Sequence, residues 1–477
     1  MDKIKFGTDG WRAKIAKDFT FQSLSHVTLA AATVMKRRLP DRKKIYVGYD
    51  RRFLSQDFAK TVAIIFSKMG YEVAISASAM PTPVYSWCSK NDPKAVGAVV
   101  ITASHNPPEW NGFKFKEIFG CSALPETTEA FEREILSMAV SDDLVPDLDI
   151  FDDLIRQSKI TLVDPMSDYL SAVKKLVDVD AIRKALFRVG LDTMFGSGSG
   201  HLANLLESLN VHVEPIHFSA NPGFEGIPPE PAEINLHELS SLVKKNTLIC
   251  GLATDGDADR LGAIDEYGCY FTTQKILSVV YWHMLTHHGK SWSIARSAST
   301  TKMVDLIAER NGQDCFETPV GFKYIAEKII EGKAQIGGEE SGGIGIVDHI
   351  PERDSFLTAL LLLEAMALTQ KSLSEMYEDL CKSFRPYEFI RLDLHVSNEV
   401  MDRTMKRLVK DAPSEWNGRP VASLSTLDGY KFYMKDGSWL LIRPSGTEPI
   451  FRIYAEAEST QACQKIIESA KTFVERS

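Results

Sequence analysis

The sequence lacks the features of a disulfide-bonded, membrane-spanning or nucleic-acid-binding protein. Its seven cysteines form no CxxC pair and are odd in number, so reduced thiols fit better than a disulfide framework. The longest apolar stretch, Leu357 to Leu368, is too short to cross a bilayer and contains Glu364, so we expect a buried helix there. The net charge of −9 provides no basic field for nucleic acid or an anionic membrane, and an anionic substrate would need local cations.

The first residues, Met1 to Gly7, also lack the apolar segment of a signal peptide. Together with the reduced thiols, this predicts a soluble, cytoplasmic protein. The share of charged residues, 25%, and of hydrophobic residues, 44%, is ordinary for a globular protein. A chain of 477 residues is too long for one core, so three or four domains are expected. The sequence does not indicate an oligomeric state.

The most informative stretch runs from Thr102 to Lys116. It follows the apolar run Ala95–Ile101, which predicts a strand buried on both faces. Two prolines exclude a helix, so Ser104 is expected on a loop at the carboxyl end of that strand, where open α/β sheets bind ligands. Asn111-Gly112 predicts a tight turn, and residues 113–116 alternate with period two, which places two lysines on one face. A hydroxyl beside lysines suits phosphate chemistry, and a polar turn with a solvated lysine edge is an equal alternative.

Strands and helices alternate in three successive units, and a polar loop follows the third strand of each. The predicted strands are 44–49, 71–76 and 95–101, then 187–192, 211–217 and 247–253, then 292–295, 314–317 and 334–336. Beyond the hinge predicted near Arg385-Pro386, the pattern changes to a strand, a helix, a hairpin at Asp436-Gly437 and a closing helix. The predicted fold is α/β, with three similar mixed α/β sandwich domains and a smaller α+β C-terminal domain around a central cleft. We expect the domains to cover 1–150, 151–265, 266–384 and 385–477.

Three aspartates, Asp255, Asp257 and Asp259, alternate with small residues after a predicted strand. In an extended loop they would converge on one point, which suits a hard divalent cation, and without a cation they would repel one another. With Glu266 they also fit positions one, three, five and twelve of a calcium EF-hand. Position six of that motif must be glycine and is Arg260 here, so the EF-hand reading is rejected.

Two glycine-rich segments imitate nucleotide-binding motifs and depart from them. Gly196 to Gly200 lies between a strand and a helix as a dinucleotide fingerprint does, but position 201 is histidine. A close strand-to-helix turn is favoured instead. Gly338 to Gly343 lacks the Gly-Lys-Ser/Thr of a P-loop, and its acceptors on a glycine frame suit sugar hydroxyls.

Two other segments place an arginine beside a turn. In Phe6 to Arg12, two glycines bracket an aspartate, which predicts a turn that can bring the guanidinium to a phosphate; a simple entry loop is the alternative. Arg443 to Pro449 offers a guanidinium, two hydroxyls and a glycine amide, a set complementary to phosphate. A structural arginine turn is the alternative for this segment. Arg452 follows in the next predicted strand.

Taken together, these loops resemble those of the α-D-phosphohexomutases, which include phosphoglucomutase, phosphomannomutase and phosphoglucosamine mutase. The segment from Thr102 to Pro107 resembles the phosphoserine loop, whose serine lends a phosphoryl group to the sugar and takes it back. The aspartate segment resembles the metal loop, the segment from Gly338 the sugar-recognition loop, and the segment from Arg443 the phosphate loop. The four-domain division agrees with that family.

The resemblance implies three groups of site residues. The catalytic group is Ser104, Lys114, Arg12 and His105, with Ser104 matching the phosphoserine and Lys114 a lysine assigned to proton transfer. The Mg²⁺ ligands are Ser104, Asp255, Asp257 and Asp259. The substrate-binding group is Arg260, Thr318, Gly321, Lys323, Glu339, Ser341, Arg443, Ser445, Gly446, Thr447 and Arg452.

The implied reaction interconverts hexose 1-phosphate and hexose 6-phosphate through a phosphoserine enzyme and a hexose 1,6-bisphosphate intermediate. Glucose is the expected hexose, so glucose 1,6-bisphosphate is the expected intermediate and activator. Thr318–Lys323, Asp348–Asp354 and the Glu-Glu-Ser of the sugar loop look most like phosphoglucomutases, although Gly342-Gly343 is not their usual ending. A phosphomannomutase or dual-specificity mutase stays open, and less so a phosphoglucosamine mutase or a bisphosphate synthase. Two other classes also stay open: a phosphoserine-type phosphatase, although no paired histidines lie near the aspartates, and a noncatalytic sugar-phosphate-binding protein.

Overall fold

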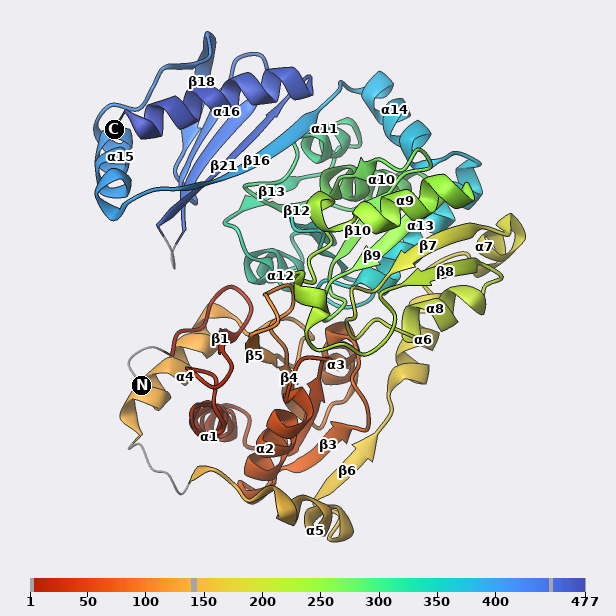
Figure 1. Cartoon of the computed structure of the whole chain (residues 1–477), viewed down its shortest axis with the longest axis vertical. Coiled ribbons are helices and arrows are strands. Elements are labelled where there is room, and N and C mark those ends of the chain that lie inside the picture. Colours follow the sequence, from red (N-terminus) through yellow and green to blue (C-terminus); the bar gives the residue numbers. More distant parts are fainter. Residues whose placement is uncertain (1–3, 139–143, 446–448, 477) are drawn as a thin grey trace.

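A computed structural model describes residues 4–138, 144–445 and 449–476 of the chain, and their strands form four main sheets covered by helices. Figure 1 shows the N-terminal sheet at the bottom and the C-terminal sheet at the upper left, with the second and third units between them on the right. The predicted fold class, three similar α/β units and a smaller C-terminal α+β unit, is confirmed.

The first sheet is mixed, because β2, β3, β4 and β6 run parallel while β5 pairs antiparallel with both of its neighbours, β4 and β1. Across the sheet its strands are β1 (Trp11–Lys14), β5 (Trp110–Lys116), β4 (Ala95–Ile101), β2 (Lys44–Tyr49), β3 (Glu72–Ser76) and β6 (Ile160–Val163). The helices of this part are α1 (Phe21–Arg38), α2 (Ser55–Lys68), α3 (Thr82–Asn91), α4 (Pro125–Ser137) and α5 (Phe151–Arg156). Since β6 pairs with β3, the first sheet extends past the predicted boundary at residue 150.

The tight turn predicted at Asn111-Gly112 is wrong, because both residues lie inside β5. Gly112 pairs with Arg12 of β1, and a Cβ atom on it would lie 2.5 Å from the carbonyl oxygen of Thr102. The Asn111 amide donates to the Ser55 hydroxyl across 2.9 Å. The glycine therefore allows close approach of neighbouring backbone, a role that the Asn-Gly turn signal does not distinguish.

The second sheet has the strand order β11 (Tyr270–Phe271), β10 (Leu261–Ile264), β9 (Cys250–Thr254), β7 (Arg188–Asp192) and β8 (His212–Ile216). Its helices are α6 (Met166–Lys174), α7 (Val179–Ala185), α8 (His201–Glu207) and α9 (His237–Asn246). The predicted turn at Gly196 to Gly200 connects β7 to α8. Strand β11 pairs with β10, so this sheet also extends past its predicted boundary, at residue 265.

The third sheet has the order β13 (Cys315–Thr318), β12 (Ile294–Ser297), β14 (Ile336–Gly338) and β15 (Ile344–Ile346). Its helices are α10 (Thr273–Thr286), α11 (Met303–Arg310), α12 (Phe322–Ile330), α13 (Ser355–Thr369) and α14 (Leu373–Ser383). The fourth sheet is antiparallel, in the order β16 (Glu388–His395), β21 (Ile450–Ala457), β20 (Trp439–Pro444), β19 (Tyr430–Met434), β18 (Arg419–Ser425) and β17 (Glu415–Trp416). It is covered by α15 (Asn398–Lys410) and α16 (Thr460–Glu475).

The apolar helix predicted around Leu357 to Leu368 is α13, and it is buried over twelve of its fifteen residues. Asp354 caps it by accepting hydrogen bonds from the amides of Phe356 and Leu357. Within the described ranges, no single helix is long and apolar enough to cross a membrane; α13 and α14, bent by 76°, qualify as a pair by length and composition alone.

The apolar cores do not coincide with the four units. One apolar core runs through the second and third units and takes in Met80 and Tyr85 of the first. The C-terminal sheet has a core of its own and meets the third unit through a small cluster of Ala298, Trp439, Leu441 and Tyr454. The C-terminal unit is therefore the one with the least apolar contact to the rest.

Candidate active site

Ser104 lies three residues beyond the end of β4, on the loop position that the sequence predicts. Its backbone is in the left-handed region, at φ 54°, and its amide donates to the Thr102 hydroxyl across 2.8 Å. The Ser104 hydroxyl is buried and donates to Asp255 Oδ2 across 2.6 Å. Gly256 permits this contact between loops, since a Cβ atom on it would lie 2.5 Å from the Ser104 carbonyl oxygen.

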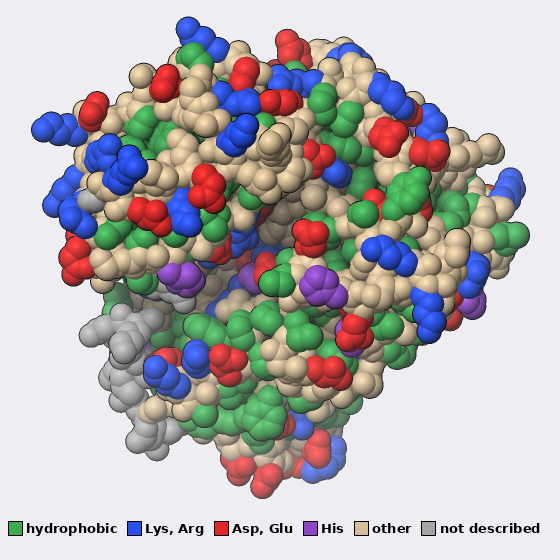
Figure 2. Space-filling view, turned by 45° about the horizontal axis from the view of Figure 1, so that its top comes forward, with side chains coloured by type: hydrophobic (Ala, Val, Ile, Leu, Met, Phe, Trp, Pro, Cys, Tyr) green, Lys and Arg blue, Asp and Glu red, His purple; other side chains and the backbone are tan. Residues whose placement is uncertain are grey.

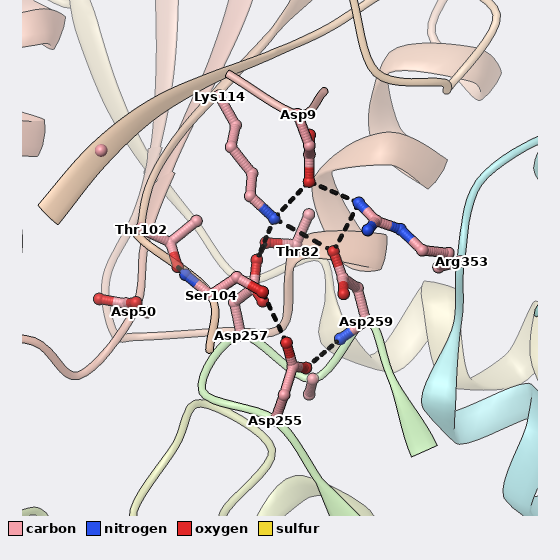
Figure 3. A network of polar contacts seen from close by, with 12 residues as sticks. Asp9, Asp50, Thr82, Thr102, Ser104, Lys114, Asp255, Asp257, Asp259 and Arg353 are labelled. Carbon is pink, nitrogen blue, oxygen red and sulfur yellow. Dashed lines mark hydrogen bonds and ion pairs between the residues drawn. The ribbon is translucent and has the colours of Figure 1, made fainter. Parts of the chain in front are cut away.

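Asp255, Asp257 and Asp259 are wholly buried on the loop after β9, and one carboxylate oxygen of each lies within 4.8 Å of the others. Figure 3 shows Asp257 and Asp259 in contact with Lys114, and Asp255 in contact with Ser104. Burial and the two neighbouring carboxylates raise the pKa of Asp255 well above its usual value. Asp257 Oδ1 and Asp259 Oδ1 have no hydrogen-bond partner among the described residues. Buried carboxylates with unsatisfied oxygens fit a hard divalent cation.

Lys114 reaches this cluster from β5. Its Nζ lies 2.6 Å from Asp9 Oδ2, 2.7 Å from Asp257 Oδ2 and 3.1 Å from Asp259 Oδ2. Burial opposes the charged amine, but the three carboxylates outweigh it and raise the pKa of Lys114. The alternative of a solvated lysine edge is wrong, because Lys114 and Lys116 have no exposed surface.

Asp9 and Arg353 join the cluster, and neither was predicted as a site residue. Arg353 Nη2 lies 3.0 Å from Asp259 Oδ2 and also donates to Asp9 Oδ2 (Figure 3). Asp9 lies in the turn at Gly7 to Gly10, and Arg353 immediately precedes the cap of α13. An aspartate between two glycines was the available signal for Asp9. For Arg353 it was the segment Asp348–Asp354, whose resemblance to phosphoglucomutases did not single out the arginine.

Arg52 is another functional candidate that the sequence did not reveal. Its side chain has no exposure and donates to the backbone carbonyls of Ser104, Asn106, Pro107 and Trp110. The guanidinium thus holds both sides of the Ser104 loop. Sequence gives no such indication, because the acceptors are backbone atoms more than fifty residues away.

The other predicted catalytic residues, His105 and Arg12, lie near Ser104, and so does Arg260, which was predicted to bind substrate. His105 Nδ1 lies 3.4 Å from the Ser104 hydroxyl oxygen, and burial with the charges of Arg260 and Arg12 lowers the pKa of His105 well below its usual value. Arg12 donates to Asn106 of the same loop across 3.0 Å. Arg260 Nε lies 3.8 Å from Asp259 Oδ1 and 4.0 Å from Asp255 Oδ2. The structure brings all of them to one centre.

The predicted sugar loop connects β14 to β15. Glu339 is buried there, 3.7 Å from Arg353 Nη1, and burial raises its pKa to about 7 in spite of Arg353 and Arg260. Ser341 is half-buried in the same turn. Arg353 therefore connects the sugar loop to the aspartate cluster.

The segment from Thr318 to Lys323 leads from β13 into α12. Thr318 is buried with its hydroxyl donating to the carbonyl of Arg296, and Gly321 has φ 131°, a value that favours glycine. The Lys323 amine lies 5.2 Å from the ring centre of Tyr324, and burial lowers the pKa of Lys323.

In the C-terminal unit, Arg443 at the end of β20 donates from Nε to Asp428 Oδ1 across 2.8 Å and is paired in the sheet with Arg452. Asp428 Oδ2 also accepts from the Val320 amide across 2.8 Å, so one carboxylate ties this segment to the loop before α12. The Ser445 amide donates to the Ile450 carbonyl, while the predicted Gly446 and Thr447 lie outside the described residues. Among the described residues, no hydrogen bond joins Arg443 to the Ser104 cluster; the two are placed on separate units. Figure 2 shows the surface hollowed in the middle of one face, with acidic and basic side chains in the depression.

Comparison with known proteins gives one result. Four domain models of the phosphoglucomutase/phosphomannomutase family match this chain. The model of alpha/beta/alpha domain I matches residues 3–139, that of domain II residues 167–268, that of domain III residues 272–384 and that of the C-terminal domain residues 399–471. A phosphoglucomutase/phosphomannomutase of Thermococcus kodakarensis is 32% identical, over 98% of this chain and 97% of the relative. A phosphoglucosamine mutase of Caldanaerobacter subterraneus is 29% identical, over 99% and 98%. A crystal structure from Thermus thermophilus, described as a phosphomannomutase, superposes with a TM-score of 0.86 at 32% identity and covers 99% of each chain.

Proposed function

Since this chain belongs to the phosphoglucomutase/phosphomannomutase family of phosphohexomutases, we propose that it interconverts glucose 1-phosphate and glucose 6-phosphate. This proposal rests mainly on one observation: the Ser104 hydroxyl donates to Asp255 Oδ2 across 2.6 Å, at the edge of the buried aspartate cluster. It supports Ser104 as the phosphoryl carrier and a cation-assisted transfer. The proposed setting is cytoplasmic, and the proposed ligands are hexose phosphates.

Asp255, Asp257 and Asp259 would hold Mg²⁺ together with the Ser104 phosphate, and the unsatisfied oxygens of Asp257 and Asp259 support this assignment. When bound, the ion neutralises charge on the transferring phosphoryl group. Arg12 and Arg260 add fixed positive charge beside the loop. Arg52 holds the carbonyl groups of the Ser104 loop and so fixes where the phosphate stands.

The transfer forms a bond between the sugar oxygen and phosphorus while the bond from phosphorus to Ser104 Oγ breaks. Lys114 is a buried ammonium at the centre of the cluster, so it is proposed to donate a proton to Ser104 Oγ as the bond to phosphorus breaks and to regain one from the sugar hydroxyl, which leaves the lysine unchanged. The bound glucose 1,6-bisphosphate then turns, and its other phosphate returns to Ser104 by the reverse step. The substrate phosphate that is not reacting is assigned to Arg443, Ser445 and their neighbours.

Glucose preference rests on the Glu-Glu-Ser of the sugar loop. The unusual ending of that loop, Gly342-Gly343, has a packing reason: a Cβ atom at 343 would lie 2.2 Å from the Arg353 side chain, and one at 342 would lie 2.6 Å from the Leu261 carbonyl oxygen. The glycines thus make room for neighbouring groups. The names of the relatives favour mannose and glucosamine phosphates as the alternatives to test.

A coupled assay with glucose 1-phosphate, mannose 1-phosphate and glucosamine 1-phosphate tests the proposal. The expected order of kcat/KM places glucose first, and a higher value for either other sugar would reassign the substrate. Intact-mass analysis should show one phosphate on the active protein that is absent in Ser104→Ala. A fully active Ser104→Ala variant would remove the phosphoserine mechanism, and release of inorganic phosphate without isomerisation would indicate a phosphatase.

A further inference from the structure

Two histidines and a glutamate converge on one point in the core, apart from the site described above. His283 lies on α10, His288 lies two residues past its end, and Glu364 lies on α13. The Nε2 atoms of both histidines lie 2.8 Å from the same carboxylate oxygen, Glu364 Oε2. The side chains of His283 and Glu364 are 2% exposed, and that of His288 is 19% exposed.

Glu364 is the only acidic residue on α13, a helix otherwise made of apolar residues with a few hydroxyls. Its carboxylate accepts hydrogen bonds from the ring nitrogens of His283 and His288 and from the Asp178 amide. No lysine or arginine of the described chain forms an ion pair with it. The helix therefore carries a buried carboxylate whose side-chain partners, within the part of the chain that the structure describes, are two imidazoles, an arrangement that apolar packing does not require.

We propose that His283, His288 and Glu364 bind one transition-metal dication of the zinc class, separately from the aspartate cluster. The three ligand atoms lie within 4.8 Å of one another. Around tetrahedral zinc, with bonds of about 2.0–2.1 Å, ligand atoms stand roughly 3.3–3.4 Å apart, so shifts of a few tenths of an ångström from the present 2.8 Å contacts admit an ion. Two imidazole nitrogens and one carboxylate favour Zn²⁺, Co²⁺ or Ni²⁺ over Mg²⁺, which prefers oxygen ligands.

The geometry also indicates what the ion would do. Glu364 Oε1 accepts a hydrogen bond of 2.5 Å from the backbone amide of Asp178, the residue that caps α7. The ion would thus fix α10, α13 and the start of α7 to one another, which joins the third unit to the second. His288 is the partly exposed ligand and marks the side from which an ion enters. The expected role is stabilisation rather than catalysis of the mutase reaction.

The test uses the full-length protein with Cys269→Ser, which removes an exposed thiol, after chelation and in excess Mg²⁺. Zn²⁺ is titrated by calorimetry, and Co²⁺ is followed by its visible absorption, which is intense in tetrahedral sites. His287→Ala is the matched control, because that residue lies between the two ligands and its Nδ1 faces the Thr286 hydroxyl instead. Asp257→Asn reports on any ion held at the aspartate cluster.

We expect one Zn²⁺ per chain, a raised melting temperature with Zn²⁺, and both effects retained in His287→Ala and Asp257→Asn. His288→Ala should weaken binding by more than the roughly 10–100-fold that loss of an outer-shell partner costs. Equal Zn²⁺ binding by His288→Ala, loss of binding in Asp257→Asn, or no Zn²⁺ binding by the unaltered chain would each overturn the proposal. Melting of His288→Ala without metal shows whether that variant is folded.

Discussion

Arg52 donates from Nη2 to the backbone carbonyl of Ser104 across 2.6 Å, and Ser104 itself has φ 54°. A serine in the left-handed region costs roughly 1–3 kcal/mol and persists only where its surroundings enforce it. The guanidinium is paired with Asp50, 3.2 Å away, and provides the donors that hold the loop in this shape. The position of the proposed nucleophile therefore depends on a residue that takes no part in the chemistry.

Replacing Arg52 tests this dependence. Arg52→Lys keeps the charge but loses the planar fork that spans four carbonyl groups, so we expect kcat to fall about a hundredfold, as a displacement of about 1 Å at a reacting atom would cause. KM should change less. Arg51→Lys is the control, since Arg51 donates to the carbonyls of Ser199 and Phe218 instead. Equal kcat in the two variants would show that Arg52 does not position the loop.

Metal removal tests the aspartate cluster. Asp257→Asn removes one negative charge with little change in volume, so the variant should fold while Mg²⁺-dependent turnover collapses. The loss of charge also releases one of the three carboxylates that hold Lys114. Steady-state rates with and without chelator measure the effect, and circular dichroism checks the fold. Unchanged activity after both chelation and substitution would leave the loop with a structural role only.

Arg443→Ala tests the proposed binding of the substrate phosphate that does not react. A bidentate arginine–phosphate contact contributes roughly 1.5–3 kcal/mol, so KM for the monophosphate should rise about ten- to a hundredfold. Phosphorylation of Ser104 should persist, because Arg443 lies on another unit. Arg419→Ala, an arginine of the same sheet paired with Glu458, is the control. An unaltered KM would exclude Arg443 from the phosphate site.

The pKa of Glu339, raised to about 7, predicts a pH dependence of stability. Between about pH 4.5 and 7 the unfolded chain has released this proton and the folded chain still holds it, so folding stability falls as the pH rises. The upper limit of the loss is about 3 kcal/mol. Glu339→Gln has no proton to release, so its melting temperature should rise relative to the parent chain over that range. Glu340→Gln, whose carboxylate pairs with Arg391, is the control and should show no such trend.

Closure of the C-terminal unit is expected on ligand binding. This unit has its own core, and its polar connections to the third unit include Lys431 with Glu317 and Asp428 with the Val320 amide. Small-angle scattering with and without glucose 1,6-bisphosphate should give a smaller radius of gyration with ligand. An identical scattering curve would argue against a hinge near Arg385-Pro386.

The sequence predicts the parts of this structure that depend on local pattern. The strands at 44–49 and 95–101 have the predicted bounds, because each is a short run rich in apolar residues. Domain boundaries are harder to predict from the sequence. Strands β6 and β11 belong to sheets whose other strands come earlier in the chain, and the pairing of strands depends on tertiary structure rather than on local pattern. The four predicted domain ranges stay predictions.

For the site, motif resemblance located Ser104, Lys114 and the aspartates, and the structure brings them together. It did not locate Arg52 or Arg353, since their partners are distant backbone carbonyls and carboxylates. The roles of all the site residues stay predictions until the variants above are measured.

The buried charges around Asp9 bear on whether the first unit can fold as a separate fragment. Lys114 and Lys116 come from the first unit, but the carboxylates that pair with them include Asp257 and Asp259 of the second and Glu352 of the third. A fragment ending near residue 165 would keep Asp9 as the remaining carboxylate beside both lysines. It would also expose to water the side chains of Met80 and Tyr85, which pack in the core shared with the second and third units, and exposed apolar area lowers the stability of the fold. The first unit should therefore be poorly stable when expressed alone and recover when the rest of the chain is supplied as a separate fragment.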